Sequence, residues 1–337
     1  MAIKRVSTLQ FPWQTSDPFL FCVHHYDAYP EGMENMGPDP DLLEGRTIGH
    51  DFEGKDGWSM YHGDQIPGFP QHPHRGFETV TIARQGFIDH HDSLGAKARF
   101  GEGDVQWMTA GKGVVHSEAF PLIYKDKPNP TELFQIWLNL PGEHKLVDPH
   151  FAMLWNEEIP AKTFEDSEGG KTTLRVVAGS FEDSQAPAPP PHSWAATPEH
   201  RVAIWTLVLE PGATFTLPAA QKGLERSLYV FEGAGIKVAD QDVPNKRRVE
   251  VHSDRNVELK NGPERTEILL LQGRPIGEPV AQHGPFVMNY PGEIRQAMLD
   301  FQATGFGGWP WGTAIPVHDR GQGRFAVHVD GREDSPE

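Results

Sequence analysis

The sequence predicts an all-β fold built from two barrel-like domains, and three observations support this prediction. The chain has 337 residues, which is long for one hydrophobic core, so two domains are expected. It contains 35 glycines and 30 prolines, which favour a turn-rich β architecture over a helical one. Short runs of alternating apolar and polar residues recur along most of the chain, each closed by glycine, proline or aspartate.

These alternating runs indicate where the strands lie. The clearest expected strands are 77–83, 104–109, 132–140, 173–178, 202–209, 227–231, 236–238 and 266–271. The stretch QAPAPPP cannot join a sheet, because proline lacks the amide donor. We therefore expect an N-terminal domain at residues 1–184, a proline-rich linker at 185–192 and a C-terminal domain at 193–337.

Two segments suggest that the domains are related. ETVTIARQG (78–86) and ERSLYVFEG (225–233) both begin with glutamate, continue as a strand and stop at glycine. The second segment has no histidine pair before its glutamate, whereas the first one does. This similarity is short, but it predicts two barrels of which only one carries polar chemistry.

One helix is expected late in the chain, after Pro291. Ile294, Ala297, Met298 and Phe301 follow the i, i+3, i+4, i+7 pattern of one helical face, and Gly305 offers a C-terminal stop. The tail from residue 307 is glycine-rich and polar, and its final residues are expected to be mobile.

Charge and cysteine content restrict the partners and the compartment. The formal net charge of −17 disfavours direct binding to nucleic acid or to anionic membranes. The single cysteine, Cys22, cannot form an intramolecular disulfide, which fits a reducing compartment. The N-terminal residues lack the apolar core of a signal peptide, and no apolar run is long enough for a transmembrane span. We expect a soluble cytoplasmic protein, or a nuclear one if the source is eukaryotic.

The first chemical signal lies in GFPQHPHRGFETVTIARQG, residues 68–86. Along a strand, residues i and i+2 point to the same face with their Cα atoms about 7 Å apart. His72 and His74 could therefore direct two imidazoles to one point. A lone His-x-His pair is more often structural than metal-binding, and Pro73 also fits an edge strand or a strand start.

A second pair follows in GEGDVQWMTAGKGVVHSEAF, residues 101–120. His116 and Glu118 repeat the i, i+2 arrangement after the glycine-containing turn TAGKG. On a neighbouring strand this pair would bring a third imidazole and a carboxylate to His72 and His74, and a small barrel would hold the four groups rigidly. The two pairs together predict a metal site, rather than structural histidines with a surface glutamate.

The segments HPHRGFETVT, GDVQWMTAGKGVVHSE and QHGPFVMN (282–289) resemble the pirin family of two-domain cupins. The resemblance extends over most of the chain. It implies a bicupin fold, two double-stranded β-helix (jelly-roll) barrels with a few short helices, and iron ligands at His72, His74, His116 and Glu118. The general cupin pattern would use Glu78 as its carboxylate ligand, whereas pirins use the position of Glu118. Glu78 is then expected to be structural or to support a ligand, and the C-terminal barrel to be a degenerate cupin.

The ligand set and the resemblance together suggest a function. Three imidazoles and a carboxylate suit Fe(II), Mn(II), Ni(II), Cu(II) or Zn(II), and the resemblance favours Fe(II). Some pirins cleave quercetin at its 2,3 bond and release carbon monoxide, which implies an oxidoreductase of the quercetinase type. Such a dioxygenase would take O2 and a small flavonol-like aromatic substrate, with Glu118 as the candidate catalytic base. The alternative is a non-enzymatic, redox-responsive iron-binding regulator that contacts a protein partner, either as a transcription coregulator or as a modulator of a metabolic enzyme.

Several neighbouring residues are candidates for supporting roles. Of Trp107 and Met108, one must face the barrel interior, and core packing is the expected role for both. His90 and His91 lie in FIDHHDSLG at a strand end, from which they could reach the metal site, but they are expected to be exposed loop histidines. Arg75 is expected to form a structural ion pair with one of the many acidic residues.

Overall fold

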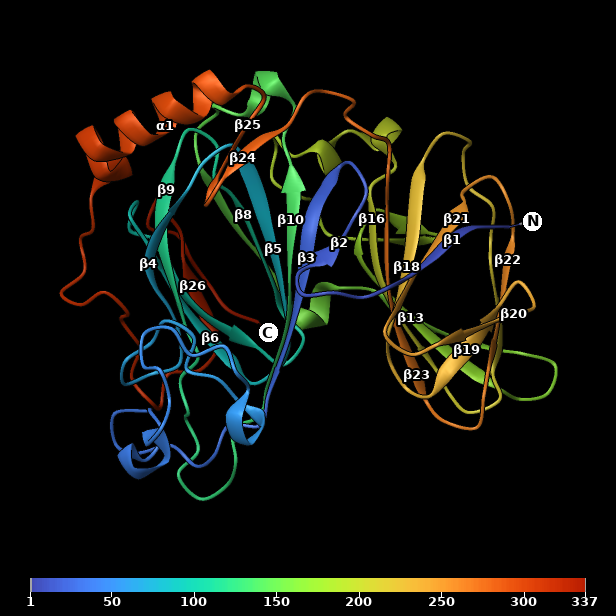
Figure 1. The fold of residues 1–337 in the computed structure, drawn as a ribbon, viewed down its shortest axis with the longest axis horizontal. Coiled ribbons are helices and arrows are strands. Elements are labelled where there is room, and N and C mark those ends of the chain that lie inside the picture. Colours follow the sequence, from blue (N-terminus) through green and yellow to red (C-terminus); the bar gives the residue numbers. More distant parts are fainter. Residues whose placement is uncertain (1, 337) are drawn as a thin grey trace. The chain divides into compact units, whose positions relative to one another are not determined.

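The computed structural model describes residues 2–336 and consists mainly of β-strands (Figure 1). Its contacts divide the chain into two compact units. One unit, which we call the N-terminal barrel, comprises Val23–Glu157 and Glu278–Glu337. The other, which we call the C-terminal barrel, comprises Met1–Cys22 and Glu158–Gly277. Among the helices of residues 2–336, none is long and apolar enough to cross a membrane.

The N-terminal barrel contains two large sheets, a small two-stranded sheet and the α-helix of the described residues. Its strands are β3 (Phe19–Asp27, which includes the border between the units), β4 (Gly68–His74), β5 (Phe77–Gln85), β6 (Phe87–Asp92), β7 (Lys97–Gly101), β8 (Val105–Thr109), β9 (Val114–Ala119), β10 (Thr131–Asn139), β11 (His150–Leu154), β24 (Ala281–His283), β25 (Phe286–Met288), β26 (Phe325–Val327) and β27 (Glu333–Asp334). One sheet runs in the order β11-β8-β5-β10-β3, and the other in the order β27-β26-β7-β6-β9-β4. The predicted strands at 77–83, 104–109 and 132–140 are confirmed as β5, β8 and β10. On β8, Trp107 and Met108 are both buried.

The C-terminal barrel repeats this two-sheet design. Its strands are β1 (Ile3–Thr8), β2 (Trp13–Gln14), β12 (Ala161–Glu165), β13 (Lys171–Ala178), β14 (Ser180–Phe181), β15 (Ser184–Gln185), β16 (Ala203–Leu209), β17 (Thr214–Leu217), β18 (Glu225–Glu232), β19 (Gly235–Val238), β20 (Gln241–Pro244), β21 (Arg247–His252), β22 (Val257–Asn261) and β23 (Thr266–Gly273). A seven-stranded sheet runs in the order β1-β21-β18-β23-β16-β13-β12, and a four-stranded sheet in the order β17-β22-β19-β20. Both sheets contribute to one apolar core.

The short repeat found in the sequence occupies the same place in each barrel. β5 lies between β8 and β10, and β18 lies between β21 and β23. The glycine that closes each strand is in the left-handed region, with φ of 75° at Gly86 and 99° at Gly233. A Cβ atom at either glycine would lie 2.6 Å from the hydroxyl of the threonine that begins the neighbouring strand, Thr131 or Thr266. Both the backbone angle and the close approach therefore require glycine.

The division into units differs from the border expected at residues 185–192. β12 and β13 precede that segment, yet β13 pairs with β16 in the C-terminal barrel. β1 pairs with β21, about 240 residues later in the chain, in the same barrel. The proline-rich stretch itself joins no sheet between residues 186 and 191, as its composition predicts. A local pattern identifies a strand but does not specify a partner so distant in the sequence.

The predicted helix is confirmed as α1 (Pro291–Thr304), which ends at Gly305 with φ of 56°. Its buried face, formed by Ile294 and Ala297, packs against Phe286 and Met288 on β25 (Figure 1). Short 3-10 helices occur at Pro40–Leu43, Lys55–Gly57, Gly142–His144, Asn156–Glu158, Trp194–Ala196, Pro198–His200 and Gly305–Gly307.

The tail after residue 307 forms more structure than its composition suggests. β26 pairs with β7, and β27 pairs with β26, so the tail extends a sheet of the N-terminal barrel. The indole of Trp311 donates a hydrogen bond to the backbone oxygen of Asp92 at 2.9 Å. The buried guanidinium of Arg99 donates to the backbone oxygens of His318, Asp319 and Gln322. These contacts attach the tail to the N-terminal barrel, and the expected mobility of its final residues stays a prediction.

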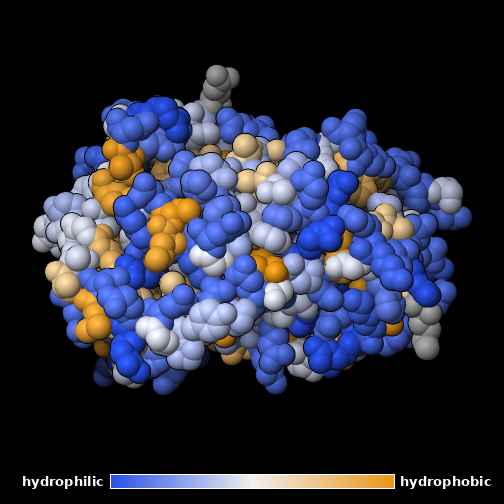
Figure 2. Space-filling model, turned by 90° about the horizontal axis from the view of Figure 1, so that it is seen from above, coloured by the Kyte–Doolittle hydropathy of each residue, from blue (hydrophilic) through white to orange (hydrophobic). Residues whose placement is uncertain are grey.

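The surface agrees with the charge of the sequence. The face drawn in Figure 2 is mostly hydrophilic, and its hydrophobic residues form small separate groups. Such scattered groups are normal on a soluble protein.

Candidate metal centre

The two predicted histidine-containing segments become neighbouring strands. β4 and β9 pair in antiparallel fashion, and His72 lies directly opposite His116. The ring centroids of His72 and His74 are 4.8 Å apart, and the His116 centroid lies 4.4 Å from the first and 4.9 Å from the second. One ligand nitrogen from each histidine can be chosen so that all three lie within 4.8 Å of one another. The structure thus brings these three predicted ligands together.

The turn TAGKG sets the start of the strand that carries His116. Gly113 has φ of 136°, and a Cβ atom there would lie 2.5 Å from the ring of Phe306. Only glycine fits this approach, so the turn and the ring together determine where β9 begins. The glycine pattern that identified the motif therefore has a structural cause.

The electrostatics of the three imidazoles favour the neutral form that binds metals. Burial lowers the pKa of His72 to about 4 and lowers the pKa values of His74 and His116 well below their usual range. The Nδ1 atom of His72 lies 2.8 Å from the backbone oxygen of Pro70 and donates to it, which leaves Nε2 with a free lone pair. A backbone acceptor on one ring nitrogen is the usual way in which a ligand histidine is oriented.

His116 gives the strongest indication that the cluster holds a further group. Its side chain is fully buried, and neither ring nitrogen has a hydrogen-bond partner within residues 2–336. Buried polar atoms in native proteins almost always have partners, so two unsatisfied nitrogens on one ring need an explanation. A divalent first-row metal would satisfy one nitrogen of each ring in such a cluster, and three neutral imidazoles suit several of these metals.

Glu118, the fourth predicted ligand, lies at the edge of the histidine cluster. One of its carboxylate oxygens is 3.9 Å from Nε2 of His116. The side-chain amide of Gln135 donates to both carboxylate oxygens, at 3.1 and 2.9 Å. Burial raises the pKa of the Glu118 carboxyl, and the hydrogen bonds from Gln135 oppose this shift. The compact group of potential ligands consists of the three histidines and does not include Glu118.

The prediction of exposed loop histidines at positions 90 and 91 is wrong. Both side chains are buried on β6, because this strand continues to Asp92 and is covered by the tail. The His90 ring lies 5.4 Å from that of His116 and stacks on Phe151 at 5.0 Å. His90 therefore belongs to the surroundings of the candidate metal centre.

Two glutamines near the centre were not identified from the sequence. Gln135 on β10 holds Glu118, and the amide of Gln106 on β8 is buried with no partner for either polar atom in the described part of the chain. Each lies in a strand of mainly buried apolar residues. A glutamine placed between apolar residues inside such a strand is the signal that could have found them.

Two other expectations agree with the structure. The guanidinium of Arg75 forms an ion pair with Asp300 at 2.6 Å, which confirms the predicted structural ion pair. Glu78 is fully buried and accepts a hydrogen bond of 2.6 Å from the Thr109 hydroxyl. This contact fits the structural role expected for Glu78.

Comparison with known proteins identifies the family. The family model described as "Pirin" matches residues 12–138, and the model described as "Pirin C-terminal cupin domain" matches residues 204–307. A protein of Pseudomonas aeruginosa named "putative quercetin 2,3-dioxygenase" is 37% identical over 249 residues, which cover 71% of this chain and 79% of that protein. The chain belongs to the pirin family. Human pirin is 35% identical over 247 residues, which cover 72% of this chain and 79% of that protein.

A solved structure supports the bicupin architecture expected of a pirin. Quercetin 2,3-dioxygenase from Acinetobacter baumannii has a crystal structure that matches this chain with a TM-score of 0.70 and 28% sequence identity. The match covers 91% of this chain and 98% of that one. The predicted all-β bicupin fold of the pirin family is confirmed. The matched pirin segments end at residue 307, so the tail strands β26 and β27 lie outside them.

Proposed function

We propose that this pirin is a metal-dependent dioxygenase of the quercetinase type, with Fe(II) bound by His72, His74, His116 and Glu118. The observation that carries the proposal is the buried cluster of three neutral histidines, in which His116 has no hydrogen-bond partner within residues 2–336. Relatives named as quercetin 2,3-dioxygenases support the reaction type. The proposed substrates are O2 and a small flavonol-like aromatic molecule.

The surroundings of the cluster suit an aromatic substrate. The rings of Phe77 and Trp137 stack with centroids 3.9 Å apart, and Trp137 meets His74 edge-on at 5.4 Å. An aromatic wall beside the ligands can hold a planar ring by stacking. Burial of His74 and His116 also limits the access of water to that side of the cluster.

The bound metal would act as a Lewis acid toward a substrate hydroxyl and would supply the redox chemistry with O2. Glu118 is the candidate general base, because its carboxylate lies beside the cluster and its raised pKa makes it a better proton acceptor. Gln135 orients that carboxylate through two hydrogen bonds. The three imidazoles remain neutral at physiological pH and do not compete for the proton.

Oxygen consumption on quercetin tests the proposal. The chain is purified without chelator or nickel resin, loaded with Fe(II) under anaerobic conditions and mixed with quercetin and O2. We expect consumption of O2 and release of carbon monoxide. A chain at full iron occupancy that consumes no O2 and releases no carbon monoxide would contradict the enzymatic proposal.

Two isosteric variants separate the proposed base from the alternative carboxylate. Glu118→Gln should abolish turnover and weaken metal binding, whereas Glu78→Gln should leave both nearly unchanged. Loss of activity in Glu78→Gln alone would assign the role to the general cupin position instead.

A chain that binds iron but has no turnover would favour the alternative function, a redox-responsive regulator. A pull-down that compares the partners of reduced and oxidised protein would test this alternative.

A further inference from the structure

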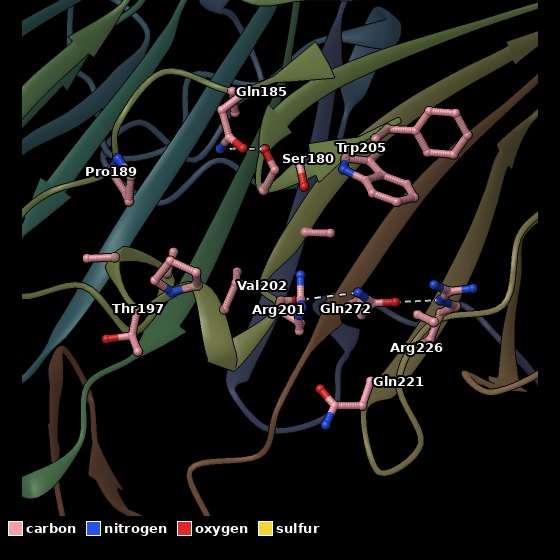
Figure 3. Close-up of a pocket in the computed structure, with 18 of the residues that line it drawn as sticks. Ser180, Gln185, Pro189, Thr197, Arg201, Val202, Trp205, Gln221, Arg226 and Gln272 are labelled. Atoms are coloured by element: carbon pink, nitrogen blue, oxygen red, sulfur yellow. Dashed lines mark hydrogen bonds between the residues drawn. The ribbon is translucent and has the colours of Figure 1, made fainter. Parts of the chain in front are cut away.

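The C-terminal barrel contains a second site that the metal chemistry does not use. A cavity of about 540 Å³ lies within this barrel, lined by residues of the segments 179–189, 195–205 and 218–226 and by Gln272 (Figure 3). This volume falls in the range of about 300–1,000 Å³ that small-molecule sites occupy. Its lining includes two arginines, Arg201 and Arg226.

Arg226 is a buried cation without an acidic partner. Its side chain lines the cavity, yet the residue is only 2% exposed. Nε donates to the Gln272 side-chain oxygen at 2.6 Å, and Nη1 donates to the backbone oxygen of Pro218 at 2.8 Å. Within residues 2–336, Nη2 has no hydrogen-bond partner and the guanidinium forms no ion pair. A buried charge without a counter-ion is costly, and buried arginines are usually paired.

The neighbouring hydrogen bonds hold this guanidinium in place. The Gln272 amide donates from Nε2 to the backbone oxygen of Arg201 at 3.1 Å, so its oxygen is directed to Arg226. Figure 3 shows Arg201, Gln272 and Arg226 in one row along the cavity, joined by these hydrogen bonds. Arg201 has φ of 52°, and its exposed side chain forms no ion pair in the described chain. The oriented amide therefore holds the Arg226 guanidinium, while the exposed Arg201 side chain adds a second cation to the lining.

The charge of the cavity contrasts with that of the chain. The acidic residue in the lining, Glu182, is already paired with Lys162, whose Nζ lies 2.7 Å away. Burial lowers the pKa of Arg226 to about 10, so the guanidinium is still charged at neutral pH. A locally cationic cavity in a chain of net charge −17 attracts anions.

The opposite part of the lining is apolar and aromatic. Trp205 and Phe181 meet edge to face with their centroids 5.1 Å apart. The indole N–H of Trp205 is already used, since it donates to the backbone oxygen of Ala178 at 3.2 Å. What this wall offers a ligand is therefore carbon surface, which favours a compact apolar or aromatic body over a bare inorganic anion.

We propose that this cavity binds a small organic carboxylate, whose acid group pairs with Arg226 and whose apolar body lies against Trp205. A carboxylate would complete the hydrogen bonding of the guanidinium and offset the cost of burying its charge. The site is independent of the metal centre, because its residues come from the C-terminal barrel alone.

Calorimetric titration of the full chain with benzoate tests the proposal, with benzamide as the neutral probe of the same shape. Benzoate should bind at least about tenfold more tightly than benzamide, because only the anion pairs with the guanidinium. The same affinity for benzoate is expected in His116→Ala and after chelator treatment. Equal affinity for the two probes, or loss of benzoate binding in His116→Ala, would overturn the proposal.

Variants locate the binding within the cavity. Arg226→Gln should weaken benzoate binding by at least about tenfold, and Arg201→Gln by a smaller factor. Arg295→Gln, which removes the same charge from the exposed surface of α1, should have no effect. If Arg226→Gln does not fold, Ala220→Trp decides, because the added ring would occupy part of the cavity and should weaken binding. Unchanged benzoate affinity in a folded Arg226→Gln, or in Ala220→Trp, would refute the assignment.

Discussion

The two barrels use the same strand order but bury different side chains at equivalent positions. In the N-terminal barrel, Thr81 lies three residues after Glu78 and pairs with Gln135 on one side and Gln106 on the other. All three side chains are polar, and Thr81 and Gln106 are completely buried. This layer of polar side chains lies in the sheet that faces the histidine-bearing strands.

The C-terminal barrel fills the equivalent layer with aliphatic residues. Leu228 lies three residues after Glu225 and pairs with Leu270 and Val249. All three are fully buried in one apolar core. The same contrast holds in the second sheet. There β4 and β9 pair His72 with His116, whereas β17 and β22 pair Phe215 with Leu259, and both of these lie in the apolar core.

This contrast shows that strands paired in this order can also enclose an apolar interior. The strand pairing alone therefore does not require buried polar side chains. An aliphatic layer gains stability from burial, whereas an unsatisfied polar layer costs stability. The polar layer of the N-terminal barrel is therefore best explained by the ligand and metal that it is proposed to hold. The predictions below test this comparison.

The largest effect is expected from removing a ligand. His116→Ala should reduce bound metal from about one equivalent per chain to almost none, because two imidazoles and a carboxylate bind far more weakly than the full set. Leu259→Ala, the control on the equivalent strand, should keep its metal. Metal analysis of the purified variants provides the measurement, and retention of metal by His116→Ala would contradict the assignment.

The next effect is expected from placing a polar side chain in the apolar barrel. Leu228→Gln should lower the free energy of unfolding of the C-terminal barrel by about 3–5 kcal/mol, because it buries an amide without partners and removes apolar contacts. Leu228→Met is the matched control and should cost less than about 1.5 kcal/mol. Urea denaturation would measure both variants. A Leu228→Gln variant as stable as Leu228→Met would mean that this barrel also tolerates a polar layer.

Acid should destabilise the metal-free N-terminal barrel. The folded pKa of His72 is about 4, and those of His74 and His116 are also lowered, so below about pH 6.5 the unfolded state binds more protons than the folded state. Stability is therefore retained above pH 6.5 and lost as the pH falls toward the folded pKa values. Between pH 6.5 and 5.5 each histidine should cost about 1 kcal/mol of unfolding free energy.

Denaturation of chelator-treated protein across this pH range measures the effect. A His74→Gln, His116→Gln double variant is the control, and its loss of unfolding free energy between pH 6.5 and 5.5 should be smaller by about 2 kcal/mol, because two of the lowered histidines are gone while His25, His72 and His91 remain. A pH profile that is identical in the two proteins would show that these histidines are not the groups that titrate.

The smallest effect is expected from removing one unsatisfied amide. Gln106→Met should raise the unfolding free energy of the metal-free chain by about 1–2 kcal/mol, because a buried amide without partners is replaced by an apolar side chain of similar length. Catalytic turnover should fall if the amide contacts the substrate. A stability decrease in Gln106→Met would indicate that this glutamine has a structural role.

Much of the fold and of the site could be predicted from local patterns. The alternating runs predicted β5, β8 and β10, and the i, i+2 spacing indicated that His72 and His74 point to the same place. These predictions succeed because strand period and side-chain direction are local properties of the backbone.

The remaining features depend on pairing between distant segments. The ladder between β1 and β21 and the addition of β26 to β7 have no local sequence signal. The burial of His90 likewise follows from pairing, since β6 lies between β7 and β9 and its ring contacts those of His116 and Phe151. Gln106 and Gln135 were missed because a glutamine between apolar residues does not disturb the pattern that predicts the strand.

The most direct test of the metal centre is an anomalous diffraction experiment on the iron-loaded chain. We predict one metal peak per chain, in the N-terminal barrel, with nitrogen atoms of His72, His74 and His116 and an oxygen of Glu118 at about 2.0–2.2 Å, the usual range for imidazole and carboxylate ligands. A peak in the C-terminal barrel, or a centre that binds Glu78 in place of Glu118, would contradict this account.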